Sequence, residues 1–403
     1  MKTAAPIYQT SPSELDAMKQ FFLTWEPRLA RRRRIPVAEP NISSREIRYV
    51  TRAISSSWIS STGDYVKRFE KLFAQIVSKT KFAISVNSGT SALHVALAAL
   101  GVGPGDEVIL PTFTMIATIN AVAYCGAIPV LIDADPVTWN MNASGIEKHV
   151  TSRTKAIIAV HTYGLPADMD TIMRVARKHD LWVVEDAAEA HGATYRGKSV
   201  GGIGDVGAFS LYANKIITTG EGGMVVTNNQ EIATRITLLH NNAFTQDMHF
   251  WHTMIGFGYR MTNLQAAVGV AQVERFTKLL AIKRANADLY IQLLAGIPGI
   301  TLPYEAPSTR HSYWMFGILV DKSKFGMDKY QLRTYLAARG IETRSFFIPI
   351  HAQPPYRHLF KNIRYPVSEK LCHDGLYLPS STKLTRRNIT YIVGMIRKAF
   401  ESH

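Results

Sequence analysis

Short apolar runs alternate with helical segments through the middle of the chain. Seven runs rich in Val, Ile and Leu have the length of buried strands: Phe82–Val86, Glu107–Leu110, Pro129–Asp133, Ala156–His161, Leu181–Glu185, Ala208–Tyr212 and Met224–Thr227. Apolar residues at helical spacing mark the segments between them, among them Ser91–Leu100, Met115–Tyr124 and Met169–Lys178. Strands that are apolar throughout and joined by helices are typical of a parallel sheet covered on both faces. The pattern therefore predicts an α/β fold with a mostly parallel seven-stranded sheet.

The pattern changes after about residue 275. A long helical stretch, which a break could interrupt, is followed by mixed elements: Leu264–Leu294 (helix), Tyr313–Val320 (strand), Lys329–Ala338 (helix), Gly340–Arg344 (strand) and a terminal helix from about Arg386. Mixed strand and helix over this length is typical of a smaller α+β domain. We predict a large domain over residues 36–275 and a small C-terminal domain over residues 276–403.

Residues 1–35 have the pattern of an N-terminal extension. Ser13–Trp25 has helical spacing, and the run Arg31–Arg34 follows as a basic linker. The chain has 46 Lys and Arg against 31 Asp and Glu, a formal charge of +15, yet this run is the one basic cluster in the sequence. Nucleic-acid binding requires clustered basic charge, so we expect an anionic small-molecule substrate and no nucleic-acid partner.

Composition narrows the class of protein further. The chain has 403 residues, of which 46% are hydrophobic, and no apolar run reaches the length of a membrane span. Its first ten residues lack the apolar segment of a secretion signal. Cys125 and Cys372 are its two cysteines, too few for a disulfide framework or a cysteine-rich zinc site. We therefore expect a cytoplasmic enzyme without a metal centre.

Two glycine-rich matches to phosphate-binding motifs occur in the wrong context. Residues 192–199 fit GxxxxGK[ST] and residues 202–207 fit GxGxxG. Both motifs bind phosphate because a strand enters the loop and a helix leaves it. Here the first match is followed by Val200-Gly201-Gly202, which cannot begin a stable helix, and a predicted strand directly follows the second. We predict that neither is a nucleotide-binding loop.

Three strand ends carry candidate chemistry. Ser88, Gly89 and Thr90 lie at a predicted helix start, where backbone amides and the helix dipole favour an anion. Asp186 ends a buried strand and needs a cationic or hydrogen-bonding partner. Lys215 comes five residues after a serine on a strand and precedes a glycine-rich turn. Together these are the three contacts that pyridoxal 5′-phosphate requires, for its phosphate, its ring nitrogen and its aldehyde.

Six regions of the chain carry motifs that belong together: residues 57–63, Asn87–Leu93, Gly103–Val108, Glu185–Ala190, Asn214–Gly223 and Tyr259–Asn263. Through them the sequence, from about residue 35 to its C-terminus, resembles the sugar-nucleotide aminotransferases of the DegT/DnrJ/EryC1/StrS family. The resemblance implies the type I aminotransferase fold, pyridoxal 5′-phosphate as cofactor and a homodimer whose sites lie at the interface.

The resemblance implies a role for each matching position. Lys215 would bind the cofactor aldehyde covalently and, once released, move the substrate proton. Asp186 would pair with the ring nitrogen, because an opposite charge favours both ionised forms. The remaining contacts implied are the phosphate site (Ser88, Gly89, Thr90 and Ser210), the hydroxyl edge of the ring (Glu189), the ring face, where many relatives carry an aromatic residue (Met115), and the sugar nucleotide (Ser60 and His351).

The resemblance also implies the reaction. L-Glutamate would donate its amino group to C4 of a 4-keto-6-deoxy sugar nucleotide, by preference GDP-4-keto-6-deoxymannose. Residues 138–141, 341–344 and 349–356 are most similar to the subgroup with that substrate. Gly258 departs from the family, because relatives commonly carry an asparagine there that reaches the phosphate of the partner subunit. Two alternatives stay open: a dTDP- or UDP-linked 4-keto or 3-keto hexose as acceptor, and a cofactor-binding regulatory protein without turnover.

Overall fold

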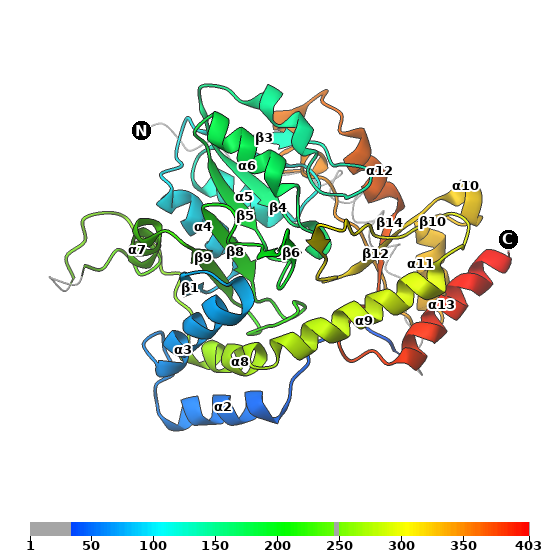
Figure 1. Cartoon of the computed structure of the whole chain (residues 1–403), viewed down its shortest axis with the longest axis horizontal. Coiled ribbons are helices and arrows are strands. Elements are labelled where there is room, and N and C mark those ends of the chain that lie inside the picture. The colour runs from blue at the N-terminus through cyan, green and yellow to red at the C-terminus, as the bar shows by residue number, and fades with distance from the viewer. Residues whose placement is uncertain (1–33, 246–249, 403) are drawn as a thin grey trace, which may run out of the picture.

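A seven-stranded sheet forms the centre of the larger half of the molecule (Figure 1). The computed structural model describes residues 34–245 and 250–402. The strand order is β1-β9-β8-β5-β4-β2-β3, and β9 runs antiparallel to both of its neighbours while the other pairs are parallel. The strands are β1 (Phe82–Val86), β2 (Glu107–Pro111), β3 (Ile128–Ile132), β4 (Thr154–Val160), β5 (Trp182–Asp186), β8 (Val206–Ser210) and β9 (Gly223–Thr227). The predicted α/β class with a mostly parallel sheet is confirmed.

Helices cover both faces of this sheet because its strands are apolar on both sides. Successive residues of β4 point to opposite faces: Ile158 packs in the cluster that contains α4, whereas Ile157 packs in the cluster that contains α6. The helices of this half are α2 (Ser44–Ser55), α3 (Asp64–Leu72), α4 (Gly89–Ala99), α5 (Ile116–Tyr124), α6 (Met169–Lys178), α7 (Gln230–Leu239) and α8 (Asn263–Val273).

The smaller half is built on a four-stranded antiparallel sheet with the order β10-β12-β14-β13. In Figure 1 the long helix α9 runs from the larger half to this sheet. Its strands are β10 (Ile300–Thr301), β12 (Phe316–Val320), β13 (Arg344–Ser345) and β14 (Gly375–Leu378). Its helices are α9 (Phe276–Leu294), α10 (Lys322–Phe325), α11 (Lys329–Ala337), α12 (Pro366–Asp374) and α13 (Arg386–Glu401).

Two predicted strands of this half are shifted. The first begins at Phe316 and not at Tyr313, because Tyr313 has a positive φ of 50° that no strand residue adopts. The second was expected over Gly340–Arg344, but Gly340 turns the chain with φ 76° and β13 starts only at Arg344. The long helical stretch is broken as foreseen, with α8 ending at Val273 and α9 beginning at Phe276.

The N-terminal extension lies largely outside the described residues, and with it the predicted helix Ser13–Trp25. The division into domains at residue 275 stays a prediction. None of the helices in the described parts of the chain has the length and apolar character needed to cross a membrane.

Candidate active site

A cavity of about 380 Å³ lies between the two sheets. It is placed where the carboxyl ends of β1, β5 and β8 meet, the position at which ligands bind in open α/β sheets. Every residue that the sequence predicts as a cofactor contact lines it: Ser88, Gly89, Thr90, Met115, Asp186, Glu189, Ser210 and Lys215. Segments up to 127 positions apart in the sequence, from Ser88 to Lys215, thus form one site.

The N-terminus of α4 forms an anion cradle at one end of the cavity. Ser88 is the N-cap, and its hydroxyl accepts a hydrogen bond from the Ser91 amide at 3.0 Å. The amides of Gly89 and Thr90 have no partner within the helix, since the first amides of any helix lack one. A side chain on Gly89 would meet the Cβ of Ser210 at 2.8 Å, so glycine is what leaves the cradle open beside that serine. The donor set suits a phosphate.

Asp186 ends β5 on the floor of the cavity and is only 5% exposed. Its Oδ2 accepts a hydrogen bond from the Thr118 hydroxyl at 2.8 Å, and its Oδ1 accepts one from the Ala188 amide at 3.2 Å. A carboxylate has about four acceptor positions, so capacity for a further donor remains. Burial raises the pKa of Asp186, and the bond from Thr118 opposes that rise. A protonated ring nitrogen is the kind of partner that such a carboxylate needs.

Lys215 lies on a closed loop between β8 and β9. The base of the loop is held by hydrogen bonds from Leu211 N to Gly222 O at 2.8 Å and from Thr219 N to Leu211 O at 3.0 Å. Gly222 has φ 155°, and a side chain there would meet the Thr219 hydroxyl at 2.3 Å. The ε-amine of Lys215 lies 3.8 Å from the centre of the Trp314 indole. Burial lowers the pKa of Lys215, whereas a nearby carboxylate, Glu189, raises it.

Glu189 and Met115 also line the cavity. The Oε2 of Glu189 accepts a hydrogen bond from the Tyr163 amide at 2.7 Å, and burial raises the pKa of Glu189 above its usual range. A carboxyl that is protonated part of the time can donate to a hydroxyl or phenolate oxygen. Met115 is the N-cap of α5 and is half exposed, and its thioether lies at the cavity; its predicted contact with the ring face stays a prediction.

The sequence predictions missed the part of the cavity wall that comes from the smaller half. Trp314, Arg344, Phe347 and Tyr377 line the cavity. Arg344 and Tyr377 are paired in register on β13 and β14, so their side chains point to the same side of the small sheet. No local signal marks these residues, because only the tertiary fold of the smaller half brings them to the cavity.

The two residues predicted to contact the sugar nucleotide do not line this cavity. The Nδ1 of His351 lies 2.8 Å from the Thr112 hydroxyl, and its Nε2 lies 3.4 Å from the Glu369 carboxylate. Ser60 is exposed, and its carbonyl accepts a hydrogen bond from the Asn263 amide at 2.7 Å. A role for either residue toward substrate remains a prediction.

The two rejected glycine-rich motifs have structural roles. Residues 192–199 contain the hairpin of β6 (Thr194–Tyr195) and β7 (Lys198–Ser199), and no helix leaves it. In the second motif the amides of Ile203 and Gly204 donate to the Glu185 carboxylate at 2.7 and 2.6 Å. That carboxylate also lies 3.0 Å from Nε2 of His161. The anion that these glycine-rich amides bind therefore belongs to the protein itself.

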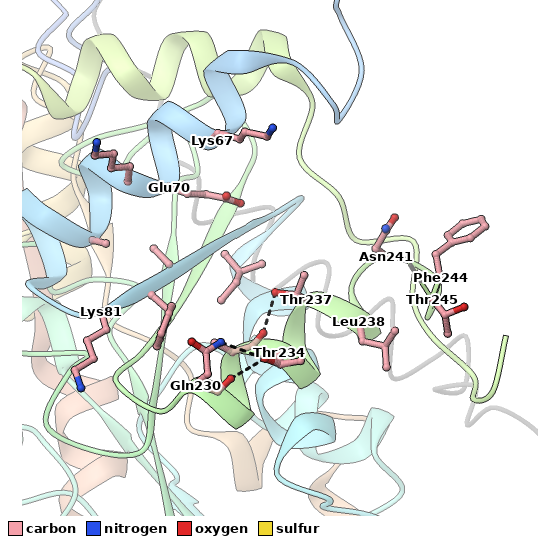
Figure 2. A pocket seen from close by; sticks show the side chains of 16 residues that line it. Lys67, Glu70, Lys81, Gln230, Thr234, Thr237, Leu238, Asn241, Phe244 and Thr245 are labelled. Carbon is pink, nitrogen blue, oxygen red and sulfur yellow. Dashed lines mark hydrogen bonds between the residues drawn. The ribbon is translucent and has the colours of Figure 1, made fainter. Parts of the chain in front are cut away.

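A second cavity, of about 900 Å³, is larger but lacks convergent chemistry (Figure 2). It lies between α3, β1 and α7, with Lys67, Lys71 and Lys81 at its edges. Among the described residues the one carboxylate that lines it, Glu70, already accepts hydrogen bonds from the amide and the hydroxyl of Ser85 at 2.9 and 2.8 Å. Volume alone does not define a site, and the smaller cavity is the one with converging donors and buried titratable groups. Within the described residues no cluster of His, Cys, Asp and Glu is arranged to hold a metal.

The fold and the site together define the class of protein: a pyridoxal-phosphate-dependent aminotransferase of fold type I. Residues 40–397 match the model of the DegT/DnrJ/EryC1/StrS aminotransferase family, and the chain belongs to that family. The expected fold, enzyme class and cofactor are thereby confirmed.

Named relatives are similar over nearly the whole chain. The chain is 45% identical to the GDP-perosamine synthase of Caulobacter vibrioides over 90% of this chain and 97% of the relative. It is 41% identical to the GDP-perosamine synthase of Escherichia coli O157:H7 over 91% and 98%. Among solved structures, DesV of S. venezuelae is 35% identical with a TM-score of 0.83, over 89% of this chain and 95% of that one.

Proposed function

We propose that the enzyme transfers the amino group of L-glutamate to C4 of GDP-4-keto-6-deoxymannose and so forms GDP-perosamine, an amino sugar nucleotide for polysaccharide assembly. The observation that carries the reaction class is the convergence of the α4 N-terminus, Asp186 and Lys215 on one cavity. The similarity to two GDP-perosamine synthases over most of the chain supports the sugar and the nucleotide.

Each cavity residue has its own role in the proposed amino transfer. When bound, pyridoxal 5′-phosphate supplies an aldehyde that takes up the amino group and a ring that accepts the electron pair released at Cα. The amides of Gly89 and Thr90, with the Ser210 hydroxyl, would hold the phosphate. Asp186 would favour a proton on the ring nitrogen by its negative charge. Lys215 would anchor the aldehyde carbon and, as a free amine, would take the Cα proton on its Nζ atom.

The acid–base properties of the pocket suit this division. A lysine must be neutral to attack an aldehyde or to accept a proton, and burial lowers the pKa of Lys215 in that direction. Asp186 must be ionised; burial raises its pKa, and a protonated ring nitrogen beside it would offset that rise. Arg344 on the opposite wall offers a fixed positive charge to an anionic substrate.

The proposed enzyme is a homodimer. The segment between α7 and α8 extends from the body of the molecule (Figure 1), and it exposes large apolar side chains at Phe250 (74%), Trp251 (61%) and Ile255 (88%). Apolar surface of this kind on one segment supports burial against a second copy of the chain. Gly258 lies on the same segment, so any contact it makes with a phosphate is by its backbone.

The decisive experiment tests the covalent bond between Lys215 and the cofactor. Borohydride reduction of the holoenzyme should fix the cofactor on Lys215, as read by peptide mass, and Lys215→Ala should lose both the adduct and turnover. A variant that transaminates at the normal rate would contradict the proposal. Purified enzyme, glutamate and a panel of GDP-, dTDP- and UDP-linked keto sugars then identify the acceptor. An adduct without turnover on any sugar would favour a regulatory role.

A further inference from the structure

Trp314 contacts Lys215 and is fixed on three sides. Its indole face lies 3.8 Å from the ε-amine of Lys215, and the ring is 4% exposed. Its Nε1 donates a hydrogen bond to the Asn214 carbonyl at 2.9 Å, next to the lysine in the chain. Its own carbonyl accepts a hydrogen bond from the buried amine of Lys283 on α9. The ring of Tyr163 is stacked with the indole, with 6.3 Å between the two ring centres. The indole is therefore a rigid surface.

The segment that carries Trp314 is also tied to the larger half of the molecule. The hydroxyl of Ser312 donates to the carbonyl of Glu189 at 3.3 Å, and the amide of Ser312 donates to the carbonyl of Gly164 at 3.0 Å. Gly164 leaves no space for a side chain, because one would meet the Ser312 hydroxyl at 2.3 Å. The position of the indole is thus set by the same backbone that carries Glu189.

A free lysine amine in this cavity needs such a surface. The lysine side chain has four rotatable carbons, and an amine that leaves the cofactor loses its covalent anchor. An indole face attracts an ammonium group more strongly than other aromatic rings do, and more so away from water. The other titratable groups that line the same cavity are Asp186, Glu189, Tyr212, Glu221, Arg344 and Tyr377. His191 is buried near enough to interact electrostatically with Lys215.

We propose that Trp314 is a positioning residue for Lys215, and that its indole face is where the ε-amine rests while it is not bonded to the cofactor. This inference rests on the proposed role of Lys215. The indole stabilises the protonated amine, so it holds the amine in place and also sets the pH at which it becomes a nucleophile. Without the indole, the ammonium form loses a favourable contact, and the amine becomes neutral at lower pH.

The test is the rate at which the full-length apoenzyme binds pyridoxal 5′-phosphate as a function of pH. Only the neutral amine attacks the aldehyde, so the rate falls on the acid side of the lysine pKa. Trp314→Leu should move this acid limb about half to one pH unit toward lower pH. Trp314→Phe, which keeps a weaker aromatic face, should move it less in the same direction. In the holoenzyme, Trp314→Leu should also lower the rate of the half-reaction with glutamate.

A matched control separates positioning from general packing. Trp139 is a buried tryptophan of the same apolar cluster, 5.2 Å from the ring of Phe346, and does not line the cavity. Trp139→Leu should lower stability and leave the pH profile unchanged. A Trp314→Leu or Trp314→Phe profile that superimposes on the wild type overturns the inference, as does an equal shift in Trp139→Leu. Borohydride fixation at a lysine other than Lys215 in the wild type would instead overturn the proposed function.

Discussion

The two walls of the active-site cavity differ in how their residues are held and in what they do. The wall from the large sheet presents backbone amides at a helix start, a buried aspartate and a lysine on a closed loop, all at strand ends. The wall from the small sheet presents larger side chains: Trp314, Arg344 and Tyr377. In the proposed reaction, the groups of the first wall would bind the cofactor and move protons, whereas those of the second would orient Lys215 and attract an anion. The proposal thus assigns the chemistry and its positioning to separate walls.

Among the substitutions that compare the two walls, removing the charge of Asp186 should lower kcat the most. Asp186→Asn keeps the size of the side chain but no longer favours a proton on the ring nitrogen, so kcat should fall at least about 100-fold. Steady-state kinetics with saturating glutamate measure it. The control is Asp205→Asn, because Asp205 is a partly buried carboxylate that accepts from the Val183 amide at 2.7 Å and does not line the cavity. A kcat in Asp186→Asn within a few-fold of the control would break the assignment.

A substitution at Arg344 tests the wall from the small sheet. Arg344 lines the cavity that holds Lys215, and an arginine fork suits a carboxylate such as those of the proposed donor, glutamate. Arg344→Gln should raise KM for glutamate about tenfold with a smaller change in kcat, because the charge binds the ground and transition states alike. Arg310→Gln, on the exposed strand β11 (Thr309–Arg310), serves as the control. An unchanged KM together with a large loss of kcat would make Arg344 part of the chemistry.

The same division explains what the sequence could predict. The large-sheet residues are each marked locally, since Gly89 follows a serine at a helix start and Asp186 ends an apolar run. The buried strands could also be predicted from the sequence, because both faces of a parallel sheet are apolar. Trp314 and Arg344 could not be predicted as site residues. An aromatic residue before a strand usually belongs to a core, and only the pairing of β13 with β14 brings the arginine to the cavity.

The hydroxyl of Thr118 offers a finer test of the large-sheet wall. Its hydrogen bond to Asp186 lowers the pKa of that carboxyl. Thr118→Val should therefore raise the pKa of Asp186 and move the acid limb of the pH profile of kcat to higher pH. We expect a loss of about tenfold in kcat at the acid end of the profile. Thr114→Val removes only the neighbouring bond, 3.0 Å from Thr114 Oγ1 to Thr118 Oγ1, and should have a smaller effect. Equal profiles for Thr118→Val and wild type would show that another group orients Asp186.

The smallest expected effect concerns stability and not catalysis. Lys283 supports the small-sheet wall through the carbonyl of Trp314, and burial lowers its pKa from 10.5 to about 7. Between these values the unfolded chain holds a proton that the folded protein has lost. The free energy of unfolding should therefore rise with pH from about 7 to 10.5, by up to about 1.4 kcal/mol per pH unit.

Lys283→Met should abolish this slope, as measured by urea denaturation at several pH values. Lys278→Met serves as the control, because Lys278 is exposed on the same helix and should leave the slope as in the wild type. A Lys283→Met protein with the full slope would mean that Lys283 stays protonated throughout, held as an ammonium by the carbonyls of Trp314 and Ser380. In that case a buried ammonium group would support the small-sheet wall. Both walls would then contain buried charge, and they would differ only in where their residues lie.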